Sequence, residues 1–384
     1  MVFDARRFLR FFYLWLFRSQ WTRRRVAIAV ASVIIVPVVE ILNWVGLLLD
    51  RILFPRFSRQ PVESPVFIVG NPRSGTTLLH RLLASDEERF STMRMWEVLF
   101  APSIVQRKLI GVMAAVDRRI GAPLGRRLGR VEEGWHESNV MHDVSLLAAE
   151  EDDYLFLHVW SALTIGLSSG LLEEARPYVY FDQALPEEER IGLMKFYRRC
   201  LQRHLYAHRH ANTATRYLAK NPALCPKLGS VLAEFPDANI VYIVRNPLEA
   251  VPSYLSMMQF SWRVIGVPTE GDALRDFLLE MAAHWYRYPL ERLARLPQGQ
   301  YTLVNYEDLV RDPQRTVEKI YAHFGFELSP AYAAELHAQS EQSRRYQSLH
   351  AYAGEALGLS RERIITEFRD VFERFGFDTA PPQK

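Results

Sequence analysis

The sequence predicts an α/β domain in residues 61–384, with a phosphate-loop-like parallel sheet flanked by helices, and an apolar helical segment in residues 1–60. The first observation behind this prediction is a set of short apolar runs, rich in β-branched residues, that are typical of buried parallel strands. These runs lie at residues 66–69, 240–244 and 301–304. The second observation is that helix-period segments separate the runs, and strands that alternate with helices indicate a doubly wound sheet. The helical segments lie at residues 77–83, 187–208, 224–234, 276–296 and 316–324.

Composition bounds the class of protein. Hydrophobic residues make up 49% of the 384 residues and charged residues 24%, which fits a folded chain rather than a disordered one. The net charge of +3 gives no general argument for nucleic-acid binding, so a polyanionic ligand needs a local basic pocket. The two cysteines, Cys200 and Cys225, lack the spacing of a metal or redox motif. They favour free thiols in a reducing compartment, although a single disulfide stays open.

Residues 1–60 combine aromatic and apolar side chains with arginines. The stretch 26–39 carries no charge, but Pro37, Glu40 and Asn43 interrupt the longer apolar run, and arginines flank it on both sides. Basic residues on both flanks give no orientation for a transmembrane helix. We therefore expect a segment that lies in the membrane interface on the cytoplasmic face, with its arginines on anionic head groups. A helical hairpin that packs on the domain or forms a homodimer is the second interpretation, and a single membrane span is the third.

A glycine-bearing turn links the first apolar run to the first helix of the domain. Gly70 and Gly75 have the spacing of a phosphate loop, in which backbone N–H groups and the helix dipole form an anion site. Thr76 stands where an ordinary phosphate loop carries lysine, which argues against nucleoside triphosphate chemistry. A guanidinium inside the loop suits a phosphate or sulfate oxygen. The residues that we expect to hold this anion are Arg73, Ser74, Gly75, Thr76 and Thr77.

The string from Pro72 to Leu78 resembles the 5′-phosphosulfate loop of sulfotransferases that use 3′-phosphoadenosine 5′-phosphosulfate (PAPS), in the bacterial and tyrosylprotein-sulfotransferase-like branch. A second family element follows the apolar run 240–244 and includes Arg245 and Ser253. The resemblance implies the sulfotransferase fold, PAPS as donor and adenosine 3′,5′-bisphosphate (PAP) as product. It also implies that Arg245 and Ser253 bind the 3′-phosphate. Both residues follow the carboxyl end of a strand, where ligands bind in open α/β sheets.

Sulfuryl transfer also needs a base for the acceptor proton and a cation for the leaving charge. Glu97 lies where this branch places a catalytic glutamate, in an apolar context that we expect to raise its pKa by burial. Lys220, in Lys-Asn-Pro, resembles the Lys-x-Pro element whose lysine contacts the transferring group. His142 and the acidic run 150–153 remain alternative bases, although that run also suits the start of the aromatic helix that follows.

Several assignments stay open at this point. Residues 343–346 occupy the region where relatives close over the nucleotide, and which of them contacts the 3′-phosphate is undecided. We expect no metal, because no group of His, Cys and carboxylate residues has ligand spacing. Loops at 100–182 and 260–272 are expected to shape the acceptor site, whose ligand the sequence does not identify.

The sequence therefore predicts a sulfotransferase that acts on a hydroxyl of a small molecule, lipid or glycolipid by in-line transfer. No nucleic-acid partner is expected. The alternative interpretations are a nucleotide kinase with an altered phosphate loop and an inactive, membrane-bound scaffold of the same fold. Magnesium-dependent turnover of ATP would favour the kinase, and the absence of PAPS turnover would favour the scaffold.

Overall fold

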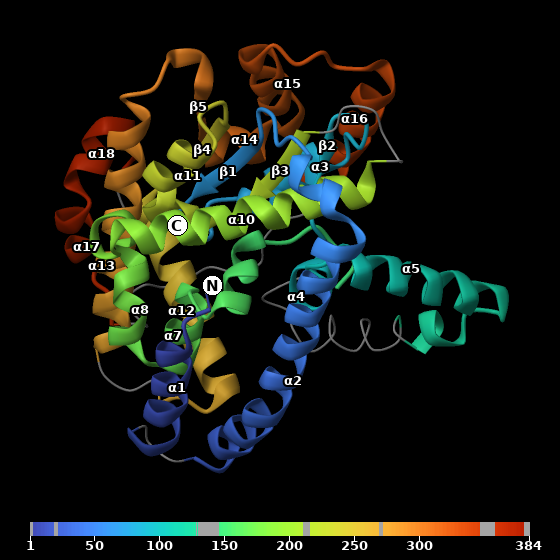
Figure 1. Cartoon of the computed structure of the whole chain (residues 1–384). Coiled ribbons are helices and arrows are strands. Elements are labelled where there is room, and N and C mark those ends of the chain that lie inside the picture. Colours follow the sequence, from blue (N-terminus) through green and yellow to red (C-terminus); the bar gives the residue numbers. More distant parts are fainter. Residues whose placement is uncertain are drawn as a thin grey trace.

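A parallel sheet forms the centre of the computed structural model, which describes residues 3–18, 22–127, 129, 146–209, 216–268, 272–345 and 358–379. Within these residues the sheet has five strands in the order β2-β3-β1-β4-β5 (Figure 1). The strands are β1 (Val66–Gly70), β2 (Phe90–Ser91), β3 (Arg216–Lys220), β4 (Asn239–Val244) and β5 (Tyr301–Asn305). All neighbouring pairs are parallel, as expected of a sheet with helices on both faces.

Helices cover both faces of the sheet and extend from it toward the N-terminal segment (Figure 1). The helices before β3 are α1 (Ala5–Tyr13), α2 (Arg23–Leu53), α3 (Thr76–Ala84), α4 (Met95–Leu99), α5 (Ile104–Arg119), α7 (Leu163–Ser169), α8 (Leu172–Val179), α9 (Phe181–Ala184) and α10 (Glu187–His208). Those after β3 are α11 (Leu228–Glu234), α12 (Pro247–Ile265), α13 (Ala273–Leu293), α14 (Tyr306–Arg311), α15 (Pro313–Phe324), α16 (Pro330–Arg345), α17 (Arg361–Glu367) and α18 (Arg369–Phe375). A π-helix (Leu14–Arg18) and short 3₁₀ segments, including η3 (Asp152–Val159), complete the described elements.

Alternate residues of the central strand face two separate cores. In β1, Phe67 and Val69 pack into the larger core with residues of α10, α11 and α13. Val66 and Ile68 face the smaller core with residues of α3, α15 and α16. This alternation follows from the two-residue period of a strand, and it explains why β1 is apolar at every position.

The predicted α/β sheet is confirmed, and three of its strands, β1, β4 and β5, coincide with the apolar runs. Strands β2 and β3 escaped the sequence analysis. β2 has only two residues, and β3 begins with Arg216 and ends with Lys220, so neither presents an apolar run. Strand β3 is formed through its parallel pairing with β1, and the local sequence alone does not indicate it.

The strand order brings distant residues to one edge of the sheet. β1 lies between β3 and β4, so Gly70, Lys220 and Val244 end three adjacent strands. Ligands of open α/β sheets bind beyond the carboxyl ends of such strands. The candidate site is therefore expected at this edge.

The N-terminal segment packs along the domain as α1 and the long helix α2 (Figure 1). Phe11 and Phe12 of α1 pack against the ring of Trp160. The carboxylate of Asp50, near the end of α2, accepts a 2.9 Å hydrogen bond from Nε of the buried Arg203. Helix α2 passes through Pro37 without a break and is long and apolar enough to cross a membrane by length and composition.

Candidate active site

The predicted anion loop forms a tight turn between β1 and α3. Gly75, at the N-cap of α3, has φ +82°, and Arg73 also takes a left-handed conformation with φ +67°. A Cβ atom at Gly70 would collide with the carbonyl oxygen of Ile243 in β4. The hydroxyl of Ser74 is buried and has no hydrogen-bond partner among the described residues. A buried, unpaired donor in a loop of this kind fits an anionic ligand such as a phosphosulfate.

Arg73, Arg245 and Ser253 meet at the edge of the sheet. Nε of Arg73 donates a 3.0 Å hydrogen bond to Oγ of Ser253 on α12. Nη1 of Arg245, which follows β4, donates a 2.7 Å hydrogen bond to the carbonyl oxygen of Arg73. The structure thus brings together the loop residue and the pair of residues that the sequence analysis connected with the 3′-phosphate.

Tyr306 supports this arrangement, although the sequence analysis did not assign it to the site. The guanidinium of Arg245 lies 4.0 Å from the centre of the Tyr306 ring, in a cation–π contact. The same ring lies where a Cβ atom at Gly75 would come within 2.7 Å of it. Tyr306 begins α14 directly after β5, and this position at a strand end is the signal that the sequence analysis did not use.

Lys220, the last residue of β3, lies buried beside two carboxylates. Its Nζ is 3.0 Å from Oε1 of Glu151 and 3.4 Å from Oε2 of Glu150. Burial alone lowers the pKa of a lysine, but these carboxylates outweigh it and raise the pKa of Lys220. The ammonium is therefore charged at neutral pH and available to an anionic group at the end of β3.

The acidic run 150–153 divides between the site and the core. Asp152 accepts hydrogen bonds from the hydroxyl of Tyr217 (2.9 Å) and from Nδ2 of Asn221 (2.8 Å). Burial raises the pKa of Asp152 to about 6, against these hydrogen bonds. Asp153 forms a buried ion pair with Lys227. Glu151, at the N-cap of η3, makes no side-chain capping bond, so the run serves mainly Lys220 and the core.

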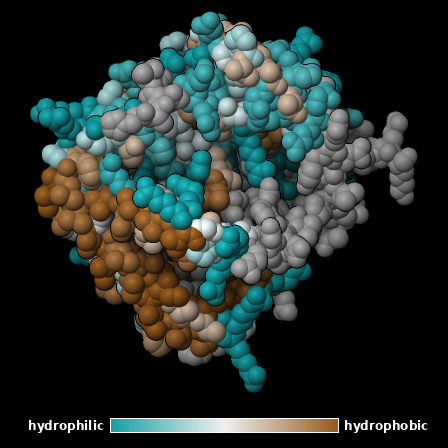
Figure 2. Space-filling view, turned by 90° about the vertical axis from the view of Figure 1, so that its right-hand side faces the viewer, coloured by the Kyte–Doolittle hydropathy of each residue, from teal (hydrophilic) through white to brown (hydrophobic). Residues whose placement is uncertain are grey.

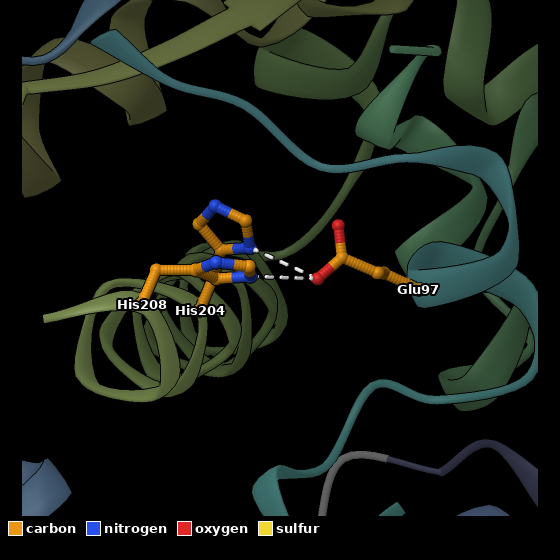
Figure 3. A group of neighbouring side chains, drawn as sticks. All are labelled: Glu97, His204 and His208. Atoms are coloured by element: carbon orange, nitrogen blue, oxygen red, sulfur yellow. Dashed lines mark hydrogen bonds and ion pairs between the residues drawn. The ribbon is translucent and has the colours of Figure 1, made fainter. Parts of the chain in front are cut away.

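Glu97, the predicted base, lies buried on α4 among cationic and histidine groups (Figure 3). Its Oε2 accepts a 2.9 Å hydrogen bond from the backbone N–H of Arg94, and Oε1 lies 3.0 Å from Nε2 of His208. Burial alone would raise the pKa of Glu97, but the guanidinium of Arg107, 3.5 Å away, and the hydrogen bond with His208 hold the pKa well below its usual range. The expected increase in pKa is therefore wrong, because the sequence did not show which cation would lie beside the carboxylate.

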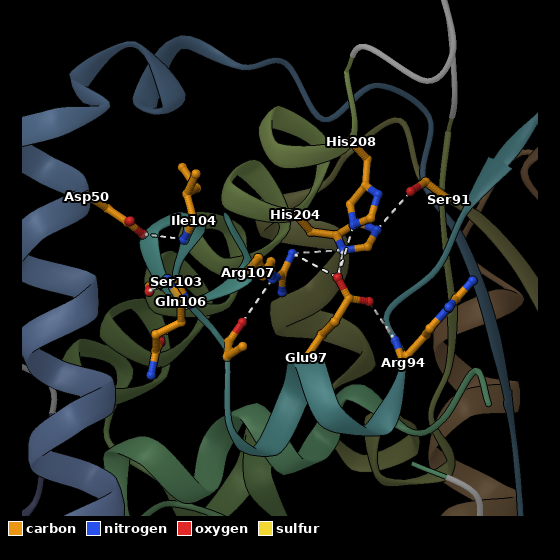
Figure 4. A network of polar contacts seen from close by, with 11 residues as sticks. Asp50, Ser91, Arg94, Glu97, Ser103, Ile104, Gln106, Arg107, His204 and His208 are labelled. Carbon is orange, nitrogen blue, oxygen red and sulfur yellow. Dashed lines mark hydrogen bonds and ion pairs between the residues drawn. The ribbon is translucent and has the colours of Figure 1, made fainter. Parts of the chain in front are cut away.

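His204 completes this network (Figure 4). Its Nδ1 lies 3.0 Å from Nη1 of Arg107, and its Nε2 lies 2.7 Å from Oγ of Ser91. Because arginine only donates, Nδ1 is assigned as the acceptor and Nε2 as the protonated nitrogen. Burial lowers the pKa of His204 to about 4, although the charge of Glu97 acts in the opposite direction. The ring is thus neutral at physiological pH.

Glu97, His204 and His208 also form a group with ligand atoms within 4.8 Å of one another. The sequence analysis missed this group, although His204 and His208 are four residues apart on one helix face. The sequence analysis was therefore wrong to find no group of His, Cys and carboxylate residues with the spacing of metal ligands. The guanidinium of Arg107 lies against both Glu97 and His204, and its positive charge opposes a metal ion there.

Other candidates lie outside the described residues. These are His142 and Tyr346, and the side chains of Arg344 and Arg345 are not described. Among the described residues, Lys220 contacts Glu150 and Glu151, whereas Glu97 contacts Arg107 and the two histidines.

Comparisons with known proteins agree on one family. The model of the sulfotransferase family matches residues 65–330. The omega-hydroxy-beta-dihydromenaquinone-9 sulfotransferase Stf3 of Mycobacterium bovis is 27% identical over 360 residues, which cover 87% of this chain and 81% of that protein. The 3-alpha-hydroxysteroid sulfotransferase of Cavia porcellus is 25% identical over 149 residues, which cover 35% of this chain and 50% of that protein.

Solved structures show the same fold. The crystal structure of sulfotransferase STF9 from Mycobacterium avium has a TM-score of 0.69 at 17% identity, with 87% of this chain and 82% of that chain covered. Sulfotransferase STF1 from Mycobacterium tuberculosis H37Rv has a TM-score of 0.58 at 22% identity, with 86% and 83% covered. At these identities the likeness extends to the fold.

Proposed function

Because the chain belongs to the sulfotransferase family, we propose that it transfers a sulfuryl group from PAPS to the hydroxyl of a membrane-resident lipid alcohol. The observation that carries the donor assignment is the meeting of Arg73, Arg245 and Ser253 at the carboxyl ends of β1 and β4. Two guanidinium groups and a hydroxyl so close together favour an anionic ligand over a neutral one. The buried hydroxyl of Ser74 supports an anion in the adjoining loop.

The two ends of the donor have separate partners in this proposal. The 5′-phosphosulfate lies on the loop and the first turn of α3, where backbone N–H groups point toward the ligand. The loop residues with this role are Arg73, Ser74, Gly75, Thr76 and Thr77. Arg245 and Ser253 hold the 3′-phosphate, and the Tyr306 ring keeps the guanidinium of Arg245 in place.

The transfer forms a bond between the acceptor oxygen and sulfur and breaks the bond between sulfur and the 5′-phosphate oxygen. The acceptor proton passes to a carboxylate, and PAP leaves with the charge that Lys220 stabilises. Glu97 is the proposed base because of its position in the family pattern, and its low pKa keeps it ionised. Glu151 is the second candidate because it touches Lys220.

Two observations favour a lipid acceptor. The mycobacterial relative is named for a hydroxylated menaquinone, which is a membrane lipid. In addition, α2 exposes a broad apolar face, as expected of a protein that contacts a membrane surface (Figure 2). We propose that this contact is with the cytoplasmic face of the membrane.

Binding of PAP tests the donor assignment. We expect PAP to raise the melting temperature of the protein, whereas ATP with Mg²⁺ has little effect. Equal stabilisation by the two nucleotides would contradict the assignment. Incubation with ³⁵S-labelled PAPS and a bacterial lipid extract then tests the acceptor class, and label that appears only in water-soluble products would exclude a lipid.

A further inference from the structure

Helix α5 exposes an apolar stripe that the described residues of the domain leave uncovered. Val112 is 62% exposed and Val116 is 52% exposed, near the middle of the helix. The stripe and its continuation consist of Leu109, Val112, Met113, Val116, Ile120 and Leu124. A surface helix normally turns such a stripe toward the core, so this one indicates a partner outside the domain.

Helix α2 also exposes apolar residues to the outside, over a greater length than α5. The residues that it buries against the domain include Arg25, Asn43 and Asp50, which are polar or charged. Apart from arginines near its two ends, its exposed residues are mostly apolar. The large ones are Val30, Val33, Ile34, Ile35, Val38, Ile41, Leu42, Val45, Leu48, Ile52 and Leu53. A continuous apolar area covers one side of the molecule (Figure 2). The inner face of α2 is mixed, since Ala29, Gly46 and Leu47 are buried as well. An apolar outer face of this length is expected where the surroundings are lipid.

Buried polar contacts fix the angle between these two helices. The carboxylate of Asp50 on α2 accepts a 2.9 Å hydrogen bond from the backbone N–H of Ile104 (Figure 4). It also accepts a 3.0 Å hydrogen bond from the backbone N–H of Val105. These are donors of the first turn of α5, which the helix itself leaves unpaired. Gln106 donates a 2.7 Å hydrogen bond to Oδ1 of Asn43. Helices α2 and α5 are therefore joined by buried hydrogen bonds at the first turn of α5.

The charges beside the apolar stripe of α5 identify the partner. Between residues 104 and 127 the only acidic residue is Asp117, whose carboxylate accepts hydrogen bonds from the backbone N–H of Leu124 and Gly125. The exposed basic residues of this stretch are Lys108, Arg118, Arg119, Arg126 and Arg127. An apolar stripe bordered by cations complements the acyl chains and anionic head groups of a bilayer.

The inner ends of both helices hold α4, which carries Glu97. Arg107 of α5 lies 3.5 Å from the Glu97 carboxylate. Nδ2 of Asn43 on α2 donates a 3.3 Å hydrogen bond to the carbonyl oxygen of Leu99, at the end of α4. The surface formed by α2 and α5 is thus joined directly to the element with the proposed base.

We propose that α5 is a second membrane-contacting arm, which enters an anionic bilayer together with the outer face of α2 and receives the acceptor alcohol from that leaflet next to α4. This inference rests on the proposed function for the identity of the acceptor. The membrane contact itself is independent of it and is measured without turnover.

A fluorescent label on α5 tests the contact. The chain has two cysteines, and both are buried, so one introduced surface cysteine is labelled selectively. With an environment-sensitive dye at Val112→Cys, we expect a blue shift on addition of vesicles that contain phosphatidylglycerol. The matched control is Ile191→Cys on α10, where an exposed apolar residue lies on another helix. A shift of the same size at both positions, or none at Val112→Cys, would overturn the proposal.

A charge variant tests the energetic importance of the stripe. Val112→Asp/Val116→Asp is expected to reduce flotation with phosphatidylglycerol vesicles by about tenfold or more, because two apolar contacts become carboxylates beside anionic lipid. The control Ile191→Asp/Leu303→Asp changes two exposed apolar residues elsewhere and is expected to float like the unchanged protein. Unchanged flotation of the α5 variant would contradict the proposal. The proposal would also be contradicted if the unchanged protein is a dimer, the α5 variant is a monomer, and both bind vesicles equally well.

Stabilisation by PAP separates the possible failures. If PAP stabilises the α5 variant as it does the unchanged protein, a loss of flotation reflects the membrane surface and not misfolding. Sulfation of an alcohol embedded in vesicles should then fall together with flotation, whereas PAP binding stays the same. If PAP stabilises neither protein, the proposed function fails, and the label at Val112→Cys still decides the membrane contact.

Discussion

Arg245 is positioned before any nucleotide binds. It lies on the Tyr306 ring, donates a hydrogen bond to the carbonyl oxygen of Arg73 and pairs with Glu249 at 2.7 Å. A guanidinium held on several sides loses little freedom when a phosphate arrives. Its planar fork, and not only its charge, is therefore expected to determine affinity for the nucleotide.

Exchange of Arg245 for lysine tests this expectation. Arg245→Lys keeps the charge but loses the fork and the stacked plane, so we expect about 30-fold to 100-fold weaker binding of PAP by calorimetry. The control Arg311→Lys changes an exposed arginine that pairs with Asp308 and should leave the affinity unchanged. Equal affinities for the two variants would remove Arg245 from the nucleotide site.

The choice of base is decided by two glutamine variants. We expect Glu97→Gln to lower kcat by about 100-fold or more while PAP binds as before, because the acceptor proton then lacks its carboxylate. Glu151→Gln is expected to lower kcat by about tenfold, because it changes only the partner of Lys220. Single-turnover rates with PAPS and a lipid alcohol measure both effects. If the order is reversed, Glu151 is the base and Glu97 has a structural role.

Asp152 makes a contribution to stability that changes with pH. Its folded-state pKa of about 6 lies above the ordinary value of 3.8, so between these values the folded chain holds a proton that the unfolded chain has released. Stability from this group therefore decreases as the pH rises through that window. We expect the free energy of unfolding of Asp152→Asn, relative to that of the unchanged protein, to increase by about 2 kcal/mol from pH 4.5 to pH 7.5. Urea unfolding at the two pH values measures this change.

At the scale of the element, the anion loop requires glycine at one position. Gly75→Ala places a methyl group 2.7 Å from the Tyr306 ring, on a backbone with φ +82°. We expect at least about tenfold weaker PAP binding and a loss of about 1 kcal/mol of stability, because the loop must change its path. Gly192→Ala lies in helix α10 with open space around it and should stabilise the protein by about 0.5 kcal/mol. Comparable losses in both variants would count against a special role for the loop.

The elements that the sequence predicts are those that carry their own signal. The turn at Gly70 and Gly75 is local, and β4 is apolar along its length, so both were predictable. Strand β3 and the group around His204 were not predictable. Strand β3 depends on pairing with the parallel strand β1, and His204 depends on Ser91, which is 113 residues away in the chain. The acidic run also shows this limit, since the adjacent carboxylates of Glu151 and Asp152 have partners of different charge, Lys220 and Asn221, that lie about 70 residues away in the chain.

At the scale of the whole molecule, the N-terminal segment is built into the domain. Asp50 is fully buried, pairs with Arg203 and accepts the first N–H groups of α5. Removing one partner of a buried ion pair leaves the other charge without compensation. The stability of the domain is therefore expected to depend on α2.

We expect Asp50→Ala to lower the free energy of unfolding by about 3–5 kcal/mol. Urea unfolding followed by circular dichroism measures the change. The control Asp272→Ala removes an exposed carboxylate that pairs with Arg275 and should cost less than about 1 kcal/mol. A small effect at Asp50 would mean that α2 rests on the domain without supporting it.

The separation of Asp50 and Arg203 along the chain has a consequence for biosynthesis. The two residues are 153 positions apart, and a ribosome that adds about 5–20 residues per second needs roughly eight to thirty seconds to span them. During that time the apolar helix α2 has left the ribosome, but Arg203, which pairs with Asp50 on its buried side, has not yet been synthesised. A chaperone or a targeting factor therefore has a period of this length in which to bind the nascent chain before the pair between Asp50 and Arg203 can form.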